Sequence, residues 1–252
     1  MKELLKIENL KLFYHTKKSE TLAISDMSFT IDEGEFVSII GPSGCGKTTV
    51  LSAIAGLIKR SGGKIVFNGE EIDSTSKNIG YMLQKDHLFE WRTIEKNLFL
   101  PLEISGMKTE ENVRYVKDLL EKYKLKDFAN YYPEQLSGGM RQRAALIRTL
   151  ATKPDLLLLD EPFSALDYQT RLAVCDDVYS IIRQEKKTAL LVTHDITEAI
   201  SLSDKIIVLT ERPSKVKKIF KTDFDKNVTP LKRRESQKFS EWFEKLYKEL
   251  NA

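Results

Sequence analysis

The chain has 252 residues, of which 41% are hydrophobic and 31% charged, a balance typical of a folded protein and not of a disordered one. Forty Lys and Arg residues against 37 Asp and Glu residues leave a net charge of +3, which gives no support for a nucleic-acid partner, and none is expected. The longest apolar runs, such as 156–159, fall far short of the ~20 residues that a membrane-spanning helix needs, so the chain is not expected to cross a bilayer.

Two further features bear on the cellular compartment. Residues 1–10 carry scattered charges and no apolar centre, so they do not resemble a secretory signal peptide. The two cysteines, Cys45 and Cys175, are too few for a disulfide framework and lack metal-ligand spacing. Both features fit a protein that stays in a reducing cytosol.

Short runs of β-branched and aromatic residues predict strands in the first third of the chain. They lie at 4–7, 10–14, 27–31, 36–40 and 64–67. The middle changes character, because apolar residues at helical spacing predict helices at 110–123 and from 93 as far as Pro101. We interpret this middle part, about 88–150, as a helical insert.

From residue 155 onward, apolar strands alternate with helical stretches. The strands are expected at 156–159, 189–192 and 206–209, and the helices at 169–184 and 196–202. This alternation is typical of a parallel sheet with crossover helices. The fold class is therefore α/β, and the segments at 36–40, 156–159 and 189–192 are expected to share one sheet.

The last forty or so residues differ from the rest. Residues 212–234 are basic and weakly patterned, and apolar residues then recur at three- and four-residue steps, which predicts a terminal amphipathic helix. They are Phe239, Trp242, Phe243, Leu246, Tyr247 and Leu250. Because the other residues of this helix include acids as well as lysines, we expect it to pack back on its own domain; a helix lying on a membrane surface is the alternative.

A glycine-rich segment, 41–48, follows the strand at 36–40 and opens a helix that is expected to end near Leu57. Its pattern, G-x-x-x-x-G-K-[ST], in this strand–loop–helix context predicts a phosphate-binding loop. Glycines let backbone N–H groups point inward, and the helix N-terminus adds partial positive charge. Lys47 is expected to bridge the β- and γ-phosphates and Thr48 to hold Mg²⁺. The alternative is a glycine-rich turn that happens to contain lysine.

Two carboxylates, Asp160 and Glu161, end the buried strand at 156–159, at the edge where open α/β sheets bind ligands. A buried acid is costly without a partner, and Asp160 is expected to be stabilised by Mg²⁺. Glu161 would polarise a water in line with the γ-phosphate. Taken alone, such a pair is more often a strand end that meets solvent than a catalytic site; the phosphate-binding loop reverses this preference and favours the catalytic interpretation.

A third element identifies the family. The segment 136–143, Leu-Ser-Gly-Gly-Met-Arg-Gln-Arg, resembles the LSGGQ signature of the ATP-binding-cassette (ABC) ATPases. Further marks of that family follow in order: Tyr14 as the adenine platform, Gln84 as the Q-loop glutamine, Ser164-Ala165-Leu166-Asp167 as the D-loop and His194 as the switch histidine. The resemblance runs from about residue 4 to 209. Without it, Tyr14 would be read as a core residue and His194 as a loop residue facing solvent.

The resemblance implies the fold of a P-loop nucleotide hydrolase, with an antiparallel β subdomain, a helical subdomain, and ATP and Mg²⁺ as cofactors. The ATPase domain would span 1–210 and a C-terminal extension 211–252. Together with the motif chemistry, the resemblance assigns catalysis to Glu161, His194, Gln84 and Lys47. Nucleotide contacts fall to Tyr14, to Gly41, Pro42, Ser43, Gly44, Cys45, Gly46, Lys47, Thr48 and Thr49, and to Ser137, Gly138 and Gly139. The metal would be held by Thr48, Gln84 and Asp160.

The family also implies a partner. Two cassettes pair head to tail, so the signature of one closes over the ATP held by the other, and the second cassette is expected to be a second copy of this chain, with a paralogue as the alternative. Met140 stands where the commonest signature has glutamine, which puts that contact with the partner's nucleotide in doubt. A hydrophobe at this position occurs in some importer subunits, so Met140 is interpreted as a subfamily trait.

Two classes of function remain, a transport motor and a soluble machine or switch. Transport is favoured because a single cassette carries none of the coiled-coil arms, zinc-binding cysteines or second cassettes of the soluble members. The resemblance then implies transmembrane permease subunits, an extracytoplasmic solute-binding protein, and a peripheral location on the cytoplasmic face of the membrane. We expect three apolar residues, Leu88, Phe89 and Trp91, to contact the permease. The alternative is that they pack inside the helical insert.

The identity of the transported solute is the most specific expectation, and it rests on resemblance alone. The segment 88–94, the Ser-Gly-Gly-Met signature and Arg212-Pro213 resemble importer ATPases that serve nitrate, sulfonates, taurine and related small anions, or vitamin precursors. The alternative is that these segments mark a style of permease docking shared by importers or exporters of unrelated solutes.

Overall fold

The computed structural model describes residues 2–15 and 20–251, and in these ranges all strands belong to one ten-stranded sheet. The strand order is β5-β4-β1-β2-β10-β9-β3-β8-β7-β6. The strands are β1 (Glu3–His15), β2 (Glu20–Asp32), β3 (Phe36–Ile40), β4 (Gly62–Phe67), β5 (Glu70–Glu71), β6 (Ile79–Met82), β7 (Leu156–Asp160), β8 (Thr188–Val192), β9 (Lys205–Leu209) and β10 (Ser214–Lys221).

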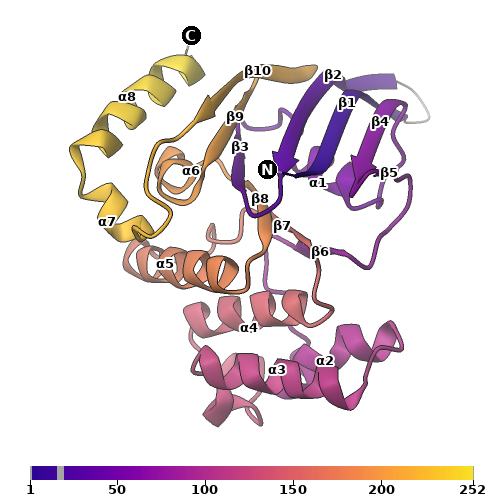
Figure 1. The fold of residues 1–252 in the computed structure, drawn as a ribbon, viewed down its shortest axis with the longest axis vertical. Helices are drawn as coiled ribbons and strands as arrows, with labels where there is room; N and C mark the ends of the chain where they lie inside the picture. The colour runs from indigo at the N-terminus through magenta and orange to yellow at the C-terminus, as the bar shows by residue number, and fades with distance from the viewer. Residues whose placement is uncertain (1, 16–19, 252) are drawn as a thin grey trace.

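The sheet has two halves of different character. Strands β9, β3, β8, β7 and β6 run parallel, and every residue of β3, β7, β8 and β9 is buried. Strands β1, β2, β4 and β5 are antiparallel (Figure 1). The predicted α/β class and the shared sheet of β3, β8 and β7 are both confirmed.

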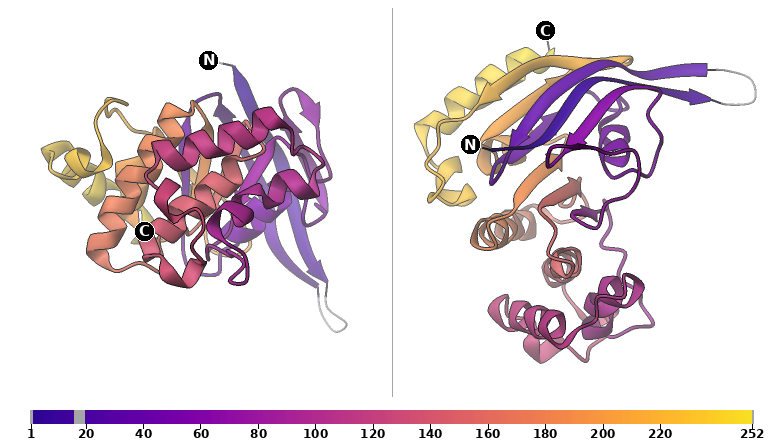
Figure 2. Two further views of the ribbon diagram at one scale, coloured as in Figure 1. Left: turned by 90° about the horizontal axis from the view of Figure 1, so that it is seen from below. Right: turned by 45° about the vertical axis from the view of Figure 1, so that its right-hand side comes forward.

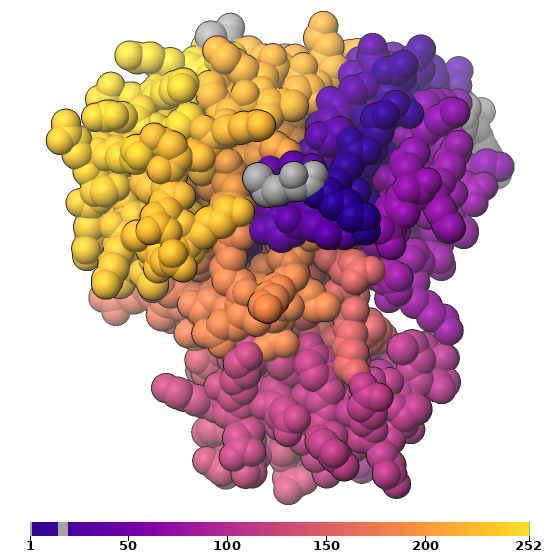
Figure 3. Space-filling model, viewed as in Figure 1, coloured from indigo at the N-terminus to yellow at the C-terminus, as the bar shows by residue number. Residues whose placement is uncertain are grey.

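Helices cover the parallel half and build a separate group beyond it. They are α1 (Lys47–Ile54), α2 (Ile94–Ile104), α3 (Glu110–Lys122), α4 (Gly138–Leu150), α5 (Tyr168–Gln184), α6 (Ile196–Leu202), α7 (Pro230–Arg234) and α8 (Gln237–Asn251), with 3₁₀ turns at Lys126–Phe128 and Pro133–Gln135. Helices α2, α3 and α4 gather at one end of the molecule, away from the β1–β2 pair (Figure 2). In the space-filling view this group forms a lobe below the sheet (Figure 3). The domain boundaries at 88, 150 and 210 stay a prediction.

Three apolar clusters hold these layers together. The first contains residues of the four helices α2, α3, α4 and α5 and of the faces of β7 and β8 that these helices cover. The second lies between α1 and the strands of both sheet halves, and α1 contributes Val50, Leu51 and Ile54 to it. A smaller third cluster lies around α6 and α8. None of the helices in the described ranges combines the length and the apolar character that a bilayer crossing requires.

The two strands expected at 4–7 and 10–14 are one strand, β1. Its pairing with β2 shifts register around Asn9, which has a left-handed backbone (φ 49°). The side chain of Ser28 on β2 ties this bulge down, because its hydroxyl accepts a hydrogen bond from Asn9 N (2.9 Å) and donates to Asn9 Oδ1 (3.0 Å). A local irregularity thus interrupts the sequence pattern without ending the strand.

The helix expected to stop at Pro101 continues to Ile104. Proline removes one backbone hydrogen bond from a helix interior, at a cost of ~3 kcal/mol. Leu98 and Leu102, on either side of it, are fully buried in the first cluster, and burial of such side chains contributes ~1.5–3 kcal/mol each. The packing offsets the cost of the proline.

The weakly patterned stretch 212–234 contains β10 and α7, neither of which was expected. Strand β10 links the two sheet halves, pairing with β9 on one side and β2 on the other. The terminal helix α8 packs back on the domain as predicted, because Leu246 is fully buried in the third cluster beside Phe239, Trp242 and Phe243. Figure 1 shows α8 along the flank formed by α6 and β10.

Candidate functional site

The loop between β3 and α1 folds around the side chain of Lys47. Gly44 and Gly46 have left-handed backbones, φ 76° and 108°, which glycine adopts without strain. Lys47 is 7% exposed, and its ammonium donates to the carbonyl oxygens of Gly41 (2.9 Å) and Pro42 (3.0 Å). Helix α1 begins at Lys47, so its positive N-terminal end faces the same space.

A pocket of about 220 Å³ opens in front of this loop. It is lined by Ser43, Gly44, Gly46, Lys47, Thr48, Thr49, Glu161 and Arg212. Backbone N–H groups, a helix N-terminus and a lysine ammonium are the donors that phosphate oxygens require. Sequence motifs more than a hundred residues apart thus share one cavity.

Asp160 lies beside this pocket at the end of β7, 4% exposed. Its two carboxylate oxygens accept hydrogen bonds from the hydroxyls of Thr48 (3.0 Å) and Tyr81 (3.2 Å). Burial raises the pKa of Asp160, and the two hydroxyl donors act against that rise. Burial, together with the nearby Asp160 charge, raises the pKa of Tyr81 to about 12, so Tyr81 stays a hydrogen-bond donor at neutral pH.

The oxygens of Thr48 and Asp160 fit a magnesium ion. Mg²⁺ prefers oxygen ligands and is usually held by one or two protein groups together with substrate phosphates and water. The part of the chain that the structure describes contains no cluster of three or more His, Cys, Asp or Glu side chains that could hold a metal by themselves.

Glu161 lies close to the Q-loop glutamine, Gln84, and to the switch histidine, His194. Its carboxylate Oε2 lies 3.1 Å from His194 Nδ1 and 3.5 Å from Gln84 Nε2. Gln84 follows β6 and His194 follows β8, the strands that flank β7. Because the carboxyl ends of parallel strands meet at one sheet edge, the topology brings these three side chains together.

Tyr14 comes to the site from the antiparallel half. Its hydroxyl lies 2.7 Å from the Thr49 hydroxyl on α1, and the tyrosine is 39% exposed. The side chain is therefore anchored at its tip beside the phosphate-binding loop while part of its ring faces solvent. An anchored, accessible ring of this kind can stack against a purine.

The signature segment lies elsewhere. Ser137 caps α4, where its hydroxyl accepts a hydrogen bond from Met140 N at 3.4 Å. Among the described residues, those that line the phosphate-loop pocket include none of Ser137, Gly138 and Gly139. Gly138 and Gly139 are tightly packed, since an added Cβ would lie 2.9 Å from Leu166 in the D-loop and 2.9 Å from Val174 on α5, respectively. Met140 packs against the first apolar cluster.

The D-loop continues from Glu161. The Ser164 hydroxyl donates to the Glu161 carbonyl (2.9 Å), and Asp167 caps α5 by accepting from Thr170 N (3.0 Å). This segment therefore connects the acidic pair to Gly138 of the signature through Leu166.

The apolar residues after Gln84 were expected either to contact a permease or to pack inside the helical insert, and they differ in their exposure. Leu88 is buried in the first cluster, as the alternative of internal packing predicted. Trp91 is 74% exposed, and its ring lies 4.7 Å from that of half-buried Phe89. A fully buried amide, Asn97, holds the loop: its Nδ2 donates to the carbonyls of Phe89, Arg92 and Thr93 at 3.0 Å each.

The same segment is bound to the signature helix. The Arg141 guanidinium contacts both oxygens of Asp86, at 2.8 and 3.1 Å, and Glu90 at 2.7 Å. Arg148, seven residues and therefore about two turns further along α4, donates to the carbonyls of Asp86 and His87 at 2.6 Å. Two arginines of α4 thus couple the Trp91 loop to the helix that Ser137 caps.

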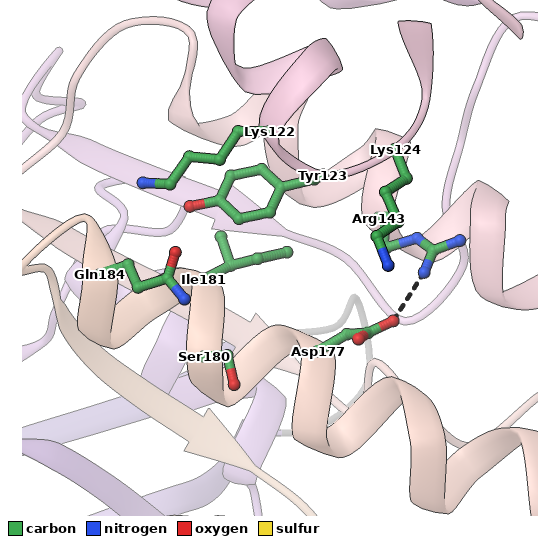
Figure 4. A pocket seen from close by; sticks show the side chains of 8 residues that line it. All are labelled: Lys122, Tyr123, Lys124, Arg143, Asp177, Ser180, Ile181 and Gln184. Atoms are coloured by element: carbon green, nitrogen blue, oxygen red, sulfur yellow. Dashed lines mark hydrogen bonds and ion pairs between the residues drawn. The ribbon is translucent and has the colours of Figure 1, made fainter. Parts of the chain in front are cut away.

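Sequence reasoning missed Tyr81 and Arg212 as site residues. Tyr81 lies within a strand and carries no motif, and Arg212 had been singled out only as a subfamily mark. A second hollow, of about 190 Å³, lies between α3, α4 and α5 and contains no candidate site residue (Figure 4). Two of its cations are paired, Lys122 with Glu185 at 2.6 Å and Arg143 with Asp177 at 2.7 Å.

Comparison with known proteins agrees with this geometry. The family model described as ABC transporter matches residues 24–164. The chain is 46% identical over 249 residues to the "Uncharacterized ABC transporter ATP-binding protein YtlC" of Bacillus subtilis (strain 168), covering 98% of this chain and 96% of that protein. It is 40% identical over 211 residues to the "Aliphatic sulfonates import ATP-binding protein SsuB" of Bacillus cereus (strain ATCC 10987 / NRS 248), covering 83% of each.

Solved structures give the same picture. The dimeric structure of a post-hydrolysis state of the ATP-binding cassette MJ0796, bound to ADP and Pi, superposes with a TM-score of 0.74 at 32% identity. The match covers 88% of this chain and 100% of that chain.

Proposed function

The chain belongs to the ABC transporter family and is an ATP-hydrolysing subunit of that family, and we propose that it energises the import of a small solute through permease subunits carried on other chains. The solute class that we propose is a sulfonate, taurine, nitrate or a similar small anion, or a vitamin precursor. Support comes from the likeness to a subunit named for aliphatic sulfonate import.

One observation carries the assignment of the site: Lys47, the Thr48–Asp160 pair and the Glu161–Gln84–His194 group meet at the same edge of the parallel sheet. Phosphoryl transfer depends on positioning and electrostatic stabilisation, which such a cluster provides. The nucleotide would lie with its phosphates in the loop of residues 41–49 and its adenine against Tyr14.

In the mechanism that we propose, Glu161 Oε2 accepts a proton from a water held opposite the γ-phosphate, and His194 and Gln84 orient that carboxylate and contact the phosphate. Lys47 moves from the loop carbonyls to the β- and γ-phosphate oxygens. Thr48 and Asp160, with Gln84, would hold Mg²⁺. When bound, this ion neutralises charge that develops on the phosphates.

Ser137, Gly138 and Gly139 have no role in the pocket of their own chain. We propose that they close over the nucleotide of a second copy, and their place at the N-terminus of α4 suits an anionic ligand. The matched cassette in its dimeric, ADP- and Pi-bound state supports this arrangement.

Trp91 and Phe89 are proposed to contact a permease at the cytoplasmic face of the membrane. A large exposed aromatic that contacts a neighbouring ring and lies on a loop held by a buried amide is typical of an interaction site. The same assembly would include an extracytoplasmic solute-binding protein, which delivers the solute to the permease.

The test is uptake by the reconstituted system. The chain would be placed in proteoliposomes with internal ATP, together with the permease and the binding protein that co-purify with it. Uptake of labelled taurine, an alkanesulfonate, nitrate, a pyrimidine precursor, a sugar and a peptide would then be compared. We expect ATP-dependent uptake of one of the anions or the precursor. Uptake of only the sugar or the peptide would contradict the proposed solute class, and ATP-driven efflux would contradict import.

A further inference from the structure

The turn between β9 and β10 brings a second cation to the phosphate-loop pocket. Arg212 lies in this turn and lines the pocket together with Lys47, other loop residues and Glu161. The pocket therefore holds two cationic side chains and one carboxylate, and the remaining side chains that line it are neutral.

Both ends of the turn are fixed against the phosphate-binding loop. At one end, a Cβ added to Gly41 would lie 3.1 Å from Leu209 Cβ. At the other, fully buried Ser214 lies beside Gly46, with 3.6 Å between its Oγ and an added Cβ. Thr210 and Lys215 close the turn with two hydrogen bonds, at 3.0 and 3.1 Å.

This close packing has a consequence for the arginine. Because Leu209 and Ser214 lie against the first and last glycines of the loop, the backbone that carries Arg212 keeps its position relative to the loop. Arg212 thus lines the pocket from a segment outside the loop, whereas Lys47 lines it from the start of α1.

Among the residues that the structure describes, none neutralises the charge of Arg212. In residues 2–15 and 20–251, no ion pair or hydrogen bond involves its guanidinium, and the side chain is exposed. Its field does reach the loop: burial raises the pKa of the Cys45 thiol, and the charges of Lys47 and Arg212 oppose that rise. An unpaired guanidinium facing a phosphate-binding loop matches the geometry of phosphate oxygens, which it binds in a bidentate manner.

We propose that Arg212 is a second cationic ligand of the nucleotide polyphosphate, beside Lys47. This inference rests on the proposed nucleotide site and adds a residue outside the family motifs. It predicts that the turn between β9 and β10 contributes to affinity for nucleoside di- and triphosphates and contributes nothing to recognition of the nucleoside.

The experiment compares Arg212→Ala, Arg212→Lys and Lys215→Ala in the full chain by calorimetric titration with ADP, and with adenosine in competition. Lys215 is an exposed cation three residues away in the same hairpin and serves as the matched control. Loss of a hydrogen bond to a charged group weakens binding about tenfold or more, so the Kd for ADP should rise by that factor in Arg212→Ala, less in Arg212→Lys and not in Lys215→Ala. Adenosine affinity should stay unchanged.

Lys47→Ala separates this inference from the site on which it rests. If Lys47→Ala loses ADP and Arg212→Ala binds it like the parent chain, the site stands and Arg212 is not a ligand. If adenosine and ADP weaken equally in Arg212→Ala, the arginine only supports the turn, and the inference is wrong. If ADP binding survives Lys47→Ala unchanged, the proposed site itself is wrong.

Discussion

Glu161 leaves β7 with a left-handed backbone, φ 44°, an uncommon conformation for a residue with a side chain. Its N–H donates to the Val192 carbonyl (2.9 Å) and its own carbonyl accepts from Ser164 (2.9 Å), so contacts on both sides maintain it. Backbone strain of this kind, ~1–3 kcal/mol, is common where a side chain must be aimed at a reacting group. Here it directs the carboxylate toward His194 and Gln84.

Glu161→Gln should lower ATP turnover by about 10²-fold or more while leaving ATP binding intact, because a positioned general base contributes ~10²–10⁴-fold and glutamine keeps the size and the acceptor oxygen. Phosphate release and nucleotide titration measure the two effects separately. Glu121→Gln, on the exposed side of α3, is the control and should behave like the parent. Near-normal turnover in Glu161→Gln would remove this residue from the mechanism.

Glu198 offers a test of stability next to the site. This carboxyl, on α6, is 3% exposed and accepts a hydrogen bond from Thr193, the residue before His194. Burial raises the pKa of Glu198 to about 7, from an ordinary value of 4.5. Because the folded state favours the protonated form, the stability that Glu198 contributes is complete below pH 4.5 and is lost as the pH rises through 7.

Glu198→Gln should therefore be more stable than the parent at pH 8, by about 3 kcal/mol, since each unit of pKa shift corresponds to ~1.4 kcal/mol. The advantage should shrink as the pH falls and disappear below about pH 4.5. Urea unfolding of both proteins between pH 4.5 and 8 measures it, with Glu121→Gln as the control that shows no such trend. A difference in unfolding free energy that stays constant with pH would contradict the assignment.

At the scale of elements, the loop before α2 presents Trp91 on a frame that does not depend on a partner. Asn97 bonds three carbonyls of this loop and Arg141 bonds its acidic residues, so the ring is held out toward solvent in the isolated chain. An interaction surface that is already ordered loses little conformational entropy on binding.

Trp91→Ala should leave ATP hydrolysis by the isolated chain near the parent rate and weaken assembly with the permease, because the contact is remote from the phosphates but central to the exposed apolar surface. Co-purification with the permease and ATPase assays of both forms test this. Tyr247→Ala removes an exposed aromatic from α8 and is the matched control, expected to assemble normally. Normal assembly of Trp91→Ala would show that this surface does not contact the permease.

Elements that follow a regular pattern were predictable from sequence, and those held by remote contacts were not. The buried strands β3, β7, β8 and β9 and the helix α3 lie within a residue or two of their predicted bounds, because continuous apolar runs and helical spacing depend on local composition. Strand β10 was missed, because its alternation is weak and it is held by β9 and β2 on either side. Helix α2 passes Pro101 because of tertiary packing, which no local rule contains.

The candidate site shows the same division. Two local motifs predicted the chemistry of four site residues, Lys47, Thr48, Asp160 and Glu161. The structure brings these residues together. Tyr81 contacts Asp160 because β6 lies next to β7 in the sheet, and Arg212 lines the phosphate-loop pocket because the turn between β9 and β10 lies beside it. Their roles follow from distances in space, so a single sequence offers no signal for them.

At the scale of the whole molecule, the cassette carries two parts of a nucleotide site that do not meet. The phosphate-binding loop lies at the carboxyl end of β3, and the signature begins α4, the helix of the helical lobe that lies next to the sheet (Figure 1). Gly138 and Gly139 pack against Leu166 and Val174 of the same chain, which fixes the start of α4 while Ser137 stays exposed. In the head-to-tail arrangement that we propose, a second copy would bring its signature to each loop.

Ser137→Arg should block dimerisation driven by ATP while sparing ATP binding by the monomer, because it places a long charged side chain in the proposed interface. Dimers are best measured in the Glu161→Gln background, where ATP is bound but not consumed, by gel filtration with and without ATP and Mg²⁺. Since Ser137 also caps α4, Ser137→Ala reports the cost of the lost cap alone, ~1 kcal/mol, and should still form dimers. Ser240→Arg makes the same change on the exposed face of α8 and should also dimerise. ATP-dependent dimers of Ser137→Arg at the parent level would exclude the head-to-tail arrangement and leave the two halves of the site without a partner.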